Sequence, residues 1–319
     1  MRLRIHAGVA AAIFWLAWAC LGLASEIFRV ATYNLRNYLL EAAGGRPAKP
    51  AESRAKIRES LRALQADVVA LQEVGGFEAL MELRDGLRAE GLDYPEWELV
   101  TGFDTNIQLA VLSRLPIVAR RPHTNDSFLW MGRRFQVRRG FLEVDIRVNP
   151  HYHFTLFNAH LKSRRVVPEA DEADLRQQEA LLLRQKIDAR LAAHPNANII
   201  VLGDFNDVKD SRPLRILRGR GRTALLDTRP AERNGDNLPS PTPGADPPHV
   251  TWTFYYAKED TYSREDYILI SPGMVPEWLR DQTYVLALPN WGLASDHRPI
   301  VAGFRAADRD LAEGKRPVN

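Results

Sequence analysis

The sequence contains very little cysteine: Cys20 is the one cysteine among 319 residues. It lies inside an apolar run near the N-terminus, so removing that run would leave a chain without any cysteine. Such a chain has no disulfides and no thiol chemistry, and it offers no cysteine-based metal site. Its stability must therefore come from a buried core, which a chain of this length is long enough to form.

Long apolar runs are also scarce. The run that contains Cys20 covers residues 9–21 and follows a basic start at residues 2–4. Small residues stand at positions 22 and 24, where a signal peptidase would read them, so we expect residues 1–24 to be a secretory signal peptide and the remainder to be exported. An uncleaved membrane anchor is the alternative, but the run is short for a bilayer span.

A strong excess of charge of one sign is missing as well. The whole chain carries a formal charge of +3, from 43 Lys and Arg against 40 Asp and Glu. Removal of Arg2 and Arg4 with the leader leaves 41 basic residues against 40 acids, about +1. The mature chain is therefore not a globally basic nucleic-acid binder, and local patches would have to supply any such binding.

The remainder shows no repeat and no linker, so we predict one domain over residues 25–305 followed by a polar tail over residues 306–319. Hydrophobic periodicity predicts helices at residues 51–65, 77–89 and 169–192. Apolar runs predict strands at residues 27–33, 67–71, 97–101, 107–113, 116–121, 138–148, 152–160, 198–202, 249–255, 265–270, 283–287 and 299–304. Residues 122–137 and 228–248 are expected to be loops. The order indicates an α/β fold with two mixed sheets packed face to face and helices outside.

Polar residues border or interrupt many of these strands. They are Asn34, Glu73, His160, Asp204 with Asn206, Asp266, and Asp296 with His297. Side chains alternate along a strand, so Asp204 and Asn206 are expected to point the same way. Each case alone is explained by a strand that ends in a polar turn. Taken together, they form an acid-rich set with histidine and without cysteine, which suits an oxygen-preferring ion such as Mg²⁺ or Mn²⁺.

The chain resembles the endonuclease/exonuclease/phosphatase superfamily, whose members include DNase I-like nucleases, abasic-site endonucleases, inositol polyphosphate 5-phosphatases and neutral sphingomyelinases. Seven segments carry the resemblance, in the family's order, over about residues 27–305. They are Thr32-Tyr33-Asn34-Leu35-Arg36, Leu71-Gln72-Glu73-Val74, Leu112-Ser113-Arg114-Leu115-Pro116-Ile117, Asn158-Ala159-His160-Leu161-Lys162-Ser163, Gly203-Asp204-Phe205-Asn206, Arg264-Glu265-Asp266-Tyr267-Ile268-Leu269 and Ser295-Asp296-His297-Arg298-Pro299. The fold that the resemblance implies is a four-layer α/β/β/α sandwich.

The resemblance also implies a role for each residue of the set. Asn34, Glu73 and Asp296 would hold the metal, with Mg²⁺ or Mn²⁺ as the first choice and Ca²⁺ as a further option. Asp204 would hold or deprotonate the attacking water, and Asn206 would donate to the oxygens of the phosphorus centre. His297 would contact the scissile phosphate, with Asp266 fixing its tautomer, and His160 would donate to the phosphate or the leaving oxygen.

Two departures from the abasic-site endonuclease branch indicate the subclass. That branch usually has a tyrosine at the position of His160 and an aspartate at the position of Arg36, so this chain looks more like the DNase I branch. In that branch a neighbouring carboxylate orients the histidine. Here Asp104 and Asn106 are the two candidates for the partner of His160, and the sequence leaves the choice open.

Basic residues near these motifs are candidates for contacts to substrate phosphates. Arg36, Lys162 and Arg139 are the three that we assign to this role, Arg139 from the basic cluster at residues 133–139 and Lys162 from the segment after His160. Such contacts bind phosphates without reading a base sequence. Ordinary solvated loop charge is an equally good interpretation of the cluster at residues 133–139.

We therefore predict an exported, metal-dependent phosphodiesterase, first of all a monomeric nuclease with nucleic acid as its substrate. A phosphatase or a phospholipase C-type enzyme for an inositol phosphate or a sphingomyelin-like lipid is the alternative. The apolar segment at residues 128–131 would support that alternative through membrane contact. A non-catalytic binding module is a third hypothesis, and it does not explain why Asp204, Asn206 and His297 occur together.

Overall fold

The computed structural model describes residues 26–233 and 251–308. The predicted leader (residues 1–24), most of the predicted loop at residues 228–248 and the tail beyond residue 308 lie outside this range. The described start of the tail is packed, because the backbone N–H of Ala306 donates to the carbonyl of Glu26 at 2.7 Å. None of the helices in the described part is long and apolar enough to cross a membrane.

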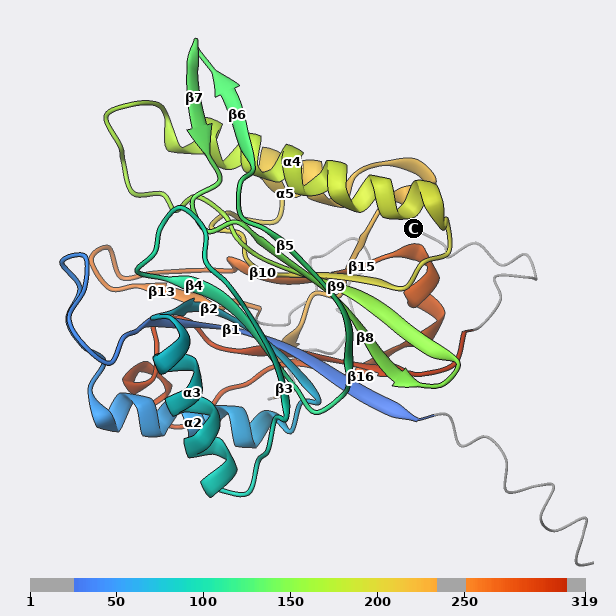
Figure 1. Ribbon diagram of the computed structural model, residues 1–319, viewed down its shortest axis with the longest axis horizontal. Coiled ribbons are helices and arrows are strands. Elements are labelled where there is room, and N and C mark those ends of the chain that lie inside the picture. The colour runs from blue at the N-terminus through green and yellow to red at the C-terminus, as the bar shows by residue number, and fades with distance from the viewer. Residues whose placement is uncertain (1–25, 234–250, 309–319) are drawn as a thin grey trace, which may run out of the picture.

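Two large sheets make up the centre of the molecule (Figure 1). The seven strands of the first sheet are, in spatial order, β12 (Ala231–Glu232), β16 (Trp278–Val285), β17 (Ile300–Arg305), β1 (Ile27–Tyr38), β2 (Val68–Val74), β4 (Gln108–Ser113) and β3 (Glu96–Val100). The six strands of the second sheet are β11 (Leu226–Asp227), β15 (Asp266–Ile270), β10 (Ile199–Asp204), β9 (Tyr152–His160), β8 (Phe141–Asn149) and β5 (Ile117–His123). Two separate hairpins are β6 (Ser127–Trp130) with β7 (Arg133–Gln136), and β13 (Phe254–Tyr256) with β14 (Thr261–Ser263).

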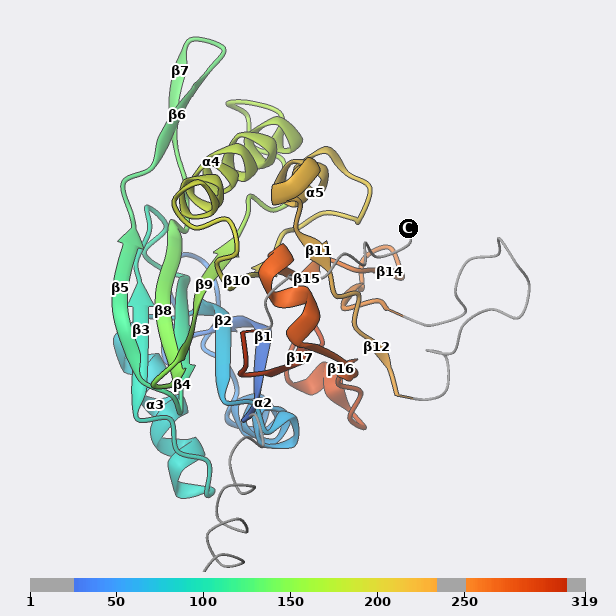
Figure 2. The ribbon, with the colours of Figure 1, turned by 90° about the vertical axis from the view of Figure 1, so that its right-hand side faces the viewer.

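Helices cover the outer faces of both sheets. The α-helices are α2 (Ala51–Leu64), α3 (Phe77–Ala89), α4 (Glu172–Ala193) and α5 (Arg212–Arg218), and the short 3₁₀ helices are η1 (Gly221–Thr223), η2 (Pro272–Glu277) and η3 (Trp291–Leu293). Figure 2 shows α2 and α3 on one side of the paired sheets and α4 with α5 on the other. The fold is thus the four-layer α/β/β/α sandwich that the sequence predicted.

Three apolar clusters hold these layers together. Side chains such as Val30 of β1 and Leu202 of β10 meet between the sheets. The other face of the first sheet packs on α2 through Leu61, and the other face of the second sheet packs on α4 through Leu183. The central strands are buried on both faces, which explains why their sequences read as continuous apolar runs.

The region predicted to be a loop at residues 122–137 differs from the prediction. β5 extends to His123, and β6 and β7 form a hairpin that projects beyond α4 (Figure 1). The hairpin turns at Met131 and Gly132, which both have positive φ (47° and 75°), the backbone that a tight turn between two strands requires. Phe128 and Phe135 stack across it at 5.8 Å. Methionine is an unusual residue in such a turn, and Gly132 alone was not enough to predict a hairpin at this place.

A second element was absent from the prediction, the short helix α5. Ser211 caps it by accepting a hydrogen bond from the N–H of Leu214, and proline follows in the first turn. Leu214 and Leu217 are buried against the inner face of α4. The glycine-containing segment at residues 218–222 contains the end of α5 and the start of η1.

The structure predicts that one buried carboxylate stabilises the outer face of the second sheet. Glu143 on β8 lies 2.6 Å from Arg121, 2.7 Å from His123 and 2.7 Å from Arg190 of α4. Burial alone would raise the pKa of Glu143, but the hydrogen bonds from these three side chains lower it from 4.5 to about 2. A lowered pKa means that the stabilisation is present at neutral pH and is lost as the pH falls from about 4.5 toward 2.

We therefore expect Glu143→Gln to lower the free energy of unfolding by about 2 kcal/mol at neutral pH, since water near the rim screens part of the interaction. The loss should shrink steadily as the pH is lowered. Urea denaturation at several pH values measures both effects. Glu96→Gln is the matched control, because its ion pair with Arg120 is exposed and contributes little. An equal loss at all pH values would contradict the expectation.

Candidate active site

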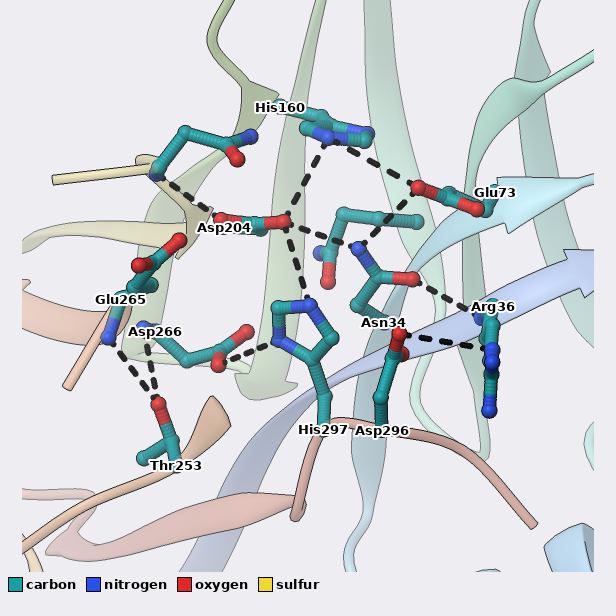
Figure 3. A network of polar contacts seen from close by, with 12 residues as sticks. Asn34, Arg36, Glu73, His160, Asp204, Thr253, Glu265, Asp266, Asp296 and His297 are labelled. Atoms are coloured by element: carbon teal, nitrogen blue, oxygen red, sulfur yellow. Dashed lines mark hydrogen bonds and ion pairs between the residues drawn. The ribbon is translucent and has the colours of Figure 1, made fainter. Parts of the chain in front are cut away.

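The polar residues that follow the strands meet at one end of the two-sheet sandwich (Figure 3). β1 runs parallel to β2, and β9 runs parallel to β10, so the carboxyl ends of each pair lie side by side. The register places His160 opposite Asp204 and Asp204 opposite Asp266. Asn34 joins the two sheets, because its Nδ2 donates to Asp204 Oδ2 at 2.8 Å.

Asp204 lies at the centre of this arrangement and is buried. Its Oδ1 accepts the backbone N–H of Asn206 at 2.8 Å. Its Oδ2 faces the Nε2 atoms of His160 at 3.4 Å and of His297 at 3.7 Å, in addition to Asn34. Burial raises the pKa of Asp204, and the charge of Asp266 adds to the rise, while His297 and Asn34 oppose it. A buried carboxylate with a raised pKa is a stronger base when it is ionised.

His297 forms a hydrogen-bonded pair with Asp266. Its Nδ1 lies 2.8 Å from Asp266 Oδ2, and the backbone N–H of Asp266 donates to Thr253 Oγ1 at 3.1 Å. The ring of Phe254 packs on the imidazole at 4.7 Å. Burial alone would lower the pKa of His297, but the negative charges of Asp266 and Asp204 raise it well above 6.5. The pair therefore holds a cationic imidazole with its Nε2–H directed at the centre of the site.

Glu73, Asn34 and Asp296 lie on the other side of Asp204. Asn34 Nδ2 is 3.4 Å from Glu73 Oε1, and the backbone N–H of Asn37 donates to Glu73 Oε2 at 2.8 Å. Glu73 has a positive φ of 63°, a strained conformation for this residue that turns its carboxylate into the site. Asp296 is held beside them by Arg36, whose Nε is 3.3 Å away. These are oxygen donors, and they fit a hard divalent ion.

A second group of residues could also hold a metal ion. Asp204, Asp266 and His297 offer ligand atoms that all lie within 4.8 Å of one another. His297 Nε2 faces Asp204 Oδ2 at 3.7 Å, so His297 could offer this atom while its Nδ1 keeps the hydrogen bond to Asp266. The structure therefore offers two alternative groups of metal ligands, this one and the group of Glu73, Asn34 and Asp296.

His160 is buried between the sheets, with Nε2 3.4 Å from Asp204 and 3.9 Å from Glu73. Burial and the charge of Arg139 lower its pKa well below 6.5. Its Nδ1 has no hydrogen-bond partner among the described residues. Neither candidate partner reaches it: Asp104 instead accepts from the N–H of Asn106 at 3.1 Å and pairs with Arg46 at 3.7 Å.

The three predicted phosphate-binding residues have different environments. Arg36 is half exposed at the rim and pairs with Asp296. Arg139 is buried and donates to the carbonyl of Leu161 at 3.1 Å. Lys162 Nζ donates to the carbonyls of Ser163 and Arg165 at 2.8 and 2.6 Å. Arg139 and Lys162 therefore hold the loop that follows β9, and their role as phosphate ligands stays a prediction.

Asn206 also contacts that loop. Its φ is 53°, and its Nδ2 donates to the carbonyl of Leu161 at 3.0 Å. A side-chain amide carries two N–H donors, so one remains to donate elsewhere. Asn206 lies beyond the end of β10 and has a positive φ, so strand alternation does not set the direction of its side chain, and its role toward the phosphorus centre stays a prediction.

A buried polar ladder beneath the site was not assigned from the sequence. Gln72 Nε2 donates to Thr32 Oγ1 at 2.9 Å and to Asn158 Oδ1 at 2.8 Å. Asn158 Nδ2 in turn donates to the carbonyls of Leu71 and Ala110, both at 3.0 Å. These bonds fix the spacing of the two sheets directly below Asn34 and Asp204. All three side chains belong to the segments that carry the family resemblance, one or two residues before a predicted site residue. That position is the sequence feature from which a supporting role could have been predicted.

Gly203 allows β10 to approach β9 closely at the point where the strand delivers Asp204. Its φ is +131°, and a Cβ at this position would lie 2.0 Å from the carbonyl oxygen of Ala159. We expect Gly203→Ala to lower the free energy of unfolding by at least about 3 kcal/mol, because both the backbone conformation and the space exclude a methyl group. Thermal unfolding measures this. Gly45→Ala is the control, since Gly45 has φ +76° in open space and tests the backbone cost alone; equal losses would contradict the role of the close approach.

A two-sheet α/β/β/α sandwich with this carboxylate, histidine and amide cluster at one end defines the class of DNase I-like hydrolases. A sequence model of the Endonuclease/Exonuclease/phosphatase family matches residues 31–297. The chain therefore belongs to that family, as its motifs predicted, and the family's members are hydrolases of phosphoester bonds that generally use divalent metals.

Solved structures share this fold at low sequence identity. The catalytic domain of human nocturnin, with a bound sulfate anion, is 17% identical, with a TM-score of 0.59 over 88% of this chain and 95% of that chain. A truncated TDP2 of Caenorhabditis elegans is 15% identical, with a TM-score of 0.57 over 88% and 98%. A beta toxin structure from Staphylococcus aureus is 14% identical, with a TM-score of 0.59 over 86% and 99%. No curated protein matches the sequence.

Proposed function

We propose that this protein is an exported, Mg²⁺-dependent phosphodiesterase that hydrolyses nucleic acid as a monomer. One observation carries the proposal: Asp204 lies within reach of Asn34, His160 and His297 at once. In this arrangement the carboxylate of Asp204, which would accept a proton, is surrounded by N–H groups that could donate hydrogen bonds to a phosphate. The apolar leader at residues 9–21 supports export.

In this proposal, Asp204 orients the attacking water and takes its proton, since the bond from Asn34 keeps the carboxylate in place. His297, held cationic by Asp266, donates to a phosphate oxygen and stabilises the charge that builds there. Asn206 and His160 donate to the remaining oxygens or the leaving group. Glu73, Asn34 and Asp296 would hold the divalent ion, which neutralises negative charge on the phosphate when bound.

A panel assay tests the proposal. Protein lacking residues 1–24 is incubated with plasmid DNA, single-stranded DNA, RNA, sphingomyelin and an inositol polyphosphate, with Mg²⁺, Mn²⁺, Ca²⁺ or EDTA. We expect metal-dependent cleavage of nucleic acid that Glu73→Ala abolishes. Export is tested by sequencing the N-terminus of protein collected outside the cytoplasm. Wild-type protein that leaves every nucleic acid intact would overturn the nuclease assignment.

The hairpin β6–β7 favours a second candidate, a phosphatase or phospholipase C-type enzyme that works at a membrane. Leu129 and Met131 at its tip are 65% and 86% exposed, and Arg133 and Arg134 follow directly. Apolar side chains beside arginines are suited to an anionic lipid surface. Cleavage of sphingomyelin or an inositol phosphate, with nucleic acids left intact in the same panel, would support this candidate.

A further inference from the structure

A cavity of about 570 Å³ opens beside the candidate metal-binding side of the site. The side chains that matter for its chemistry are Arg36, Tyr255, Tyr256, Lys258, Trp291 and Asp296. Its volume is in the range of pockets that bind organic ligands, and it is larger than a single phosphate needs. The cavity shares Arg36 and Asp296 with the site, so an occupant would be continuous with a substrate whose phosphate lies at Asp204.

The hairpin β13–β14 forms one wall of the cavity and is attached directly to the catalytic segment. The backbone N–H of Tyr255 donates to the carbonyl of Asp296 at 3.0 Å, and the N–H of Arg298 donates to the carbonyl of Thr253 at 2.7 Å. Phe254 pairs with His297 as an isolated bridge. The wall and the imidazole therefore keep a fixed spacing, which a subsite for part of a substrate requires.

Aromatic rings from β13 and from η3 line the cavity, and other rings pack against two of them. Trp291 packs against Trp252 at 5.2 Å, and Tyr255 packs against Tyr262 at 4.7 Å. The guanidinium of Arg298 lies 3.2 Å from the ring centre of Trp252. Rigid aromatic faces of this kind bind flat rings by stacking, and every nucleobase presents such a face.

The charges around the cavity indicate which of two ligands fits better, a quaternary ammonium group or a flat ring that carries a phosphate. A quaternary ammonium group, as in a choline headgroup, needs aromatic faces without competing cations and gains from a free carboxylate. Here Arg36 and the exposed Lys258 bring positive charge. Asp296 is the one acid among the described lining residues, and Arg36 neutralises it at 3.3 Å. The lining therefore disfavours a quaternary ammonium group and suits a flat ring that carries a phosphate.

We propose that this cavity is a nucleotide subsite, which stacks the base of the nucleotide adjoining the scissile phosphate and contacts the next phosphate through Lys258. This inference rests on the proposed hydrolysis of nucleic acid and specifies its substrate. It assigns Tyr256 and Trp291 to the base and Lys258 to the backbone. The subsite would make cleavage depend on a base beside the bond that is cut.

Three oligonucleotides test the dependence on a base. One is a short single-stranded DNA with a single cleavable phosphodiester, and the other two each carry an abasic tetrahydrofuran residue, one on each side of that bond. We expect the wild-type protein to cleave the intact DNA with a kcat/KM roughly tenfold higher than one of the abasic forms. Tyr256→Ala and Trp291→Ala should each remove most of this difference while leaving the abasic rate nearly unchanged.

Lys258→Ala should lower kcat/KM for the intact and the abasic DNA by a similar factor, because the contact is to a phosphate. Leu293→Ala is the matched control: it lies on η3 beside Trp291, is exposed and does not line the cavity. It should change neither rate. Equal losses on both substrates in Tyr256→Ala and Trp291→Ala would overturn the stacking role.

A binding measurement separates this inference from the proposed activity. Calorimetry compares AMP, ribose 5-phosphate and phosphocholine in the wild type and in Tyr256→Ala. We expect AMP to bind roughly tenfold more tightly than ribose 5-phosphate, and Tyr256→Ala to remove the difference. Absence of nuclease activity with this preference intact would overturn the nuclease assignment alone. Equal binding of AMP and ribose 5-phosphate, or tighter binding of phosphocholine, would overturn the subsite.

Discussion

Replacing Asp204 by asparagine is expected to lower kcat/KM by about 10³- to 10⁴-fold. The amide keeps the shape of the carboxylate and can still accept from the backbone N–H of Asn206. It can no longer take a proton from water, and it removes the negative charge that faces His160 and His297. The loss should therefore appear in kcat, with substrate affinity and the metal concentration needed for half activity little changed.

Steady-state kinetics at several Mg²⁺ concentrations measure this, and circular dichroism shows whether the fold persists. Asp207→Asn is the matched control, because that carboxylate lies three residues away and pairs with Arg176 at 2.9 Å instead of facing the histidines. It should alter stability more than activity. An Asp204→Asn protein that keeps more than about a tenth of wild-type activity would exclude Asp204 as the base.

Replacing Glu73 by glutamine is expected to weaken Mg²⁺ binding by about 10²-fold and to lower activity by about 10³-fold at moderate Mg²⁺. The reason is that Glu73 provides a negative charge beside Asn34 and Asp296, and glutamine leaves only a neutral oxygen. A higher Mg²⁺ concentration should restore part of the activity of Glu73→Gln. It should not restore the activity of Asp204→Asn.

Activity against Mg²⁺ concentration, together with calorimetry of metal binding, measures the effect. Glu82→Gln is the control, since Glu82 on α3 bonds to the hydroxyl of Tyr38 and to Arg54 outside the site. Asp266→Asn decides between the two groups of possible ligands. If Asp266→Asn weakens metal binding and Glu73→Gln does not, the ion belongs to Asp204, Asp266 and His297.

Much of the fold follows from local sequence patterns. The spacing of Ile57, Leu61 and Leu64 predicted the buried face of α2, and all three are buried. The apolar run that precedes Asp204 predicted β10 and its burial on both faces. These predictions succeed because helix and strand periodicities are local and the core demands apolar side chains at each inward position.

The predictions that failed depend on contacts distant in sequence or on backbone geometry. The hairpin β6–β7 turns at Met131, whose positive φ cannot be predicted from the residue type. The partner of His160 could not be assigned because it depended on where the loop at residues 104–106 would fold.

The sequence by itself determined the family, because the strand-end motifs keep their order and each lies at a recognisable break in an apolar run. It also predicted which residues would carry the chemistry. Only the tertiary structure decided which side chains surround Asp204 and how closely Gly203 brings β10 to β9. The bond from Asn34 to Asp204 joins residues 170 positions apart and crosses from one sheet to the other. This hydrogen bond depends on how the two sheets pack. The apolar cluster and the buried polar ladder between the sheets determine that packing, and no local sequence pattern encodes it.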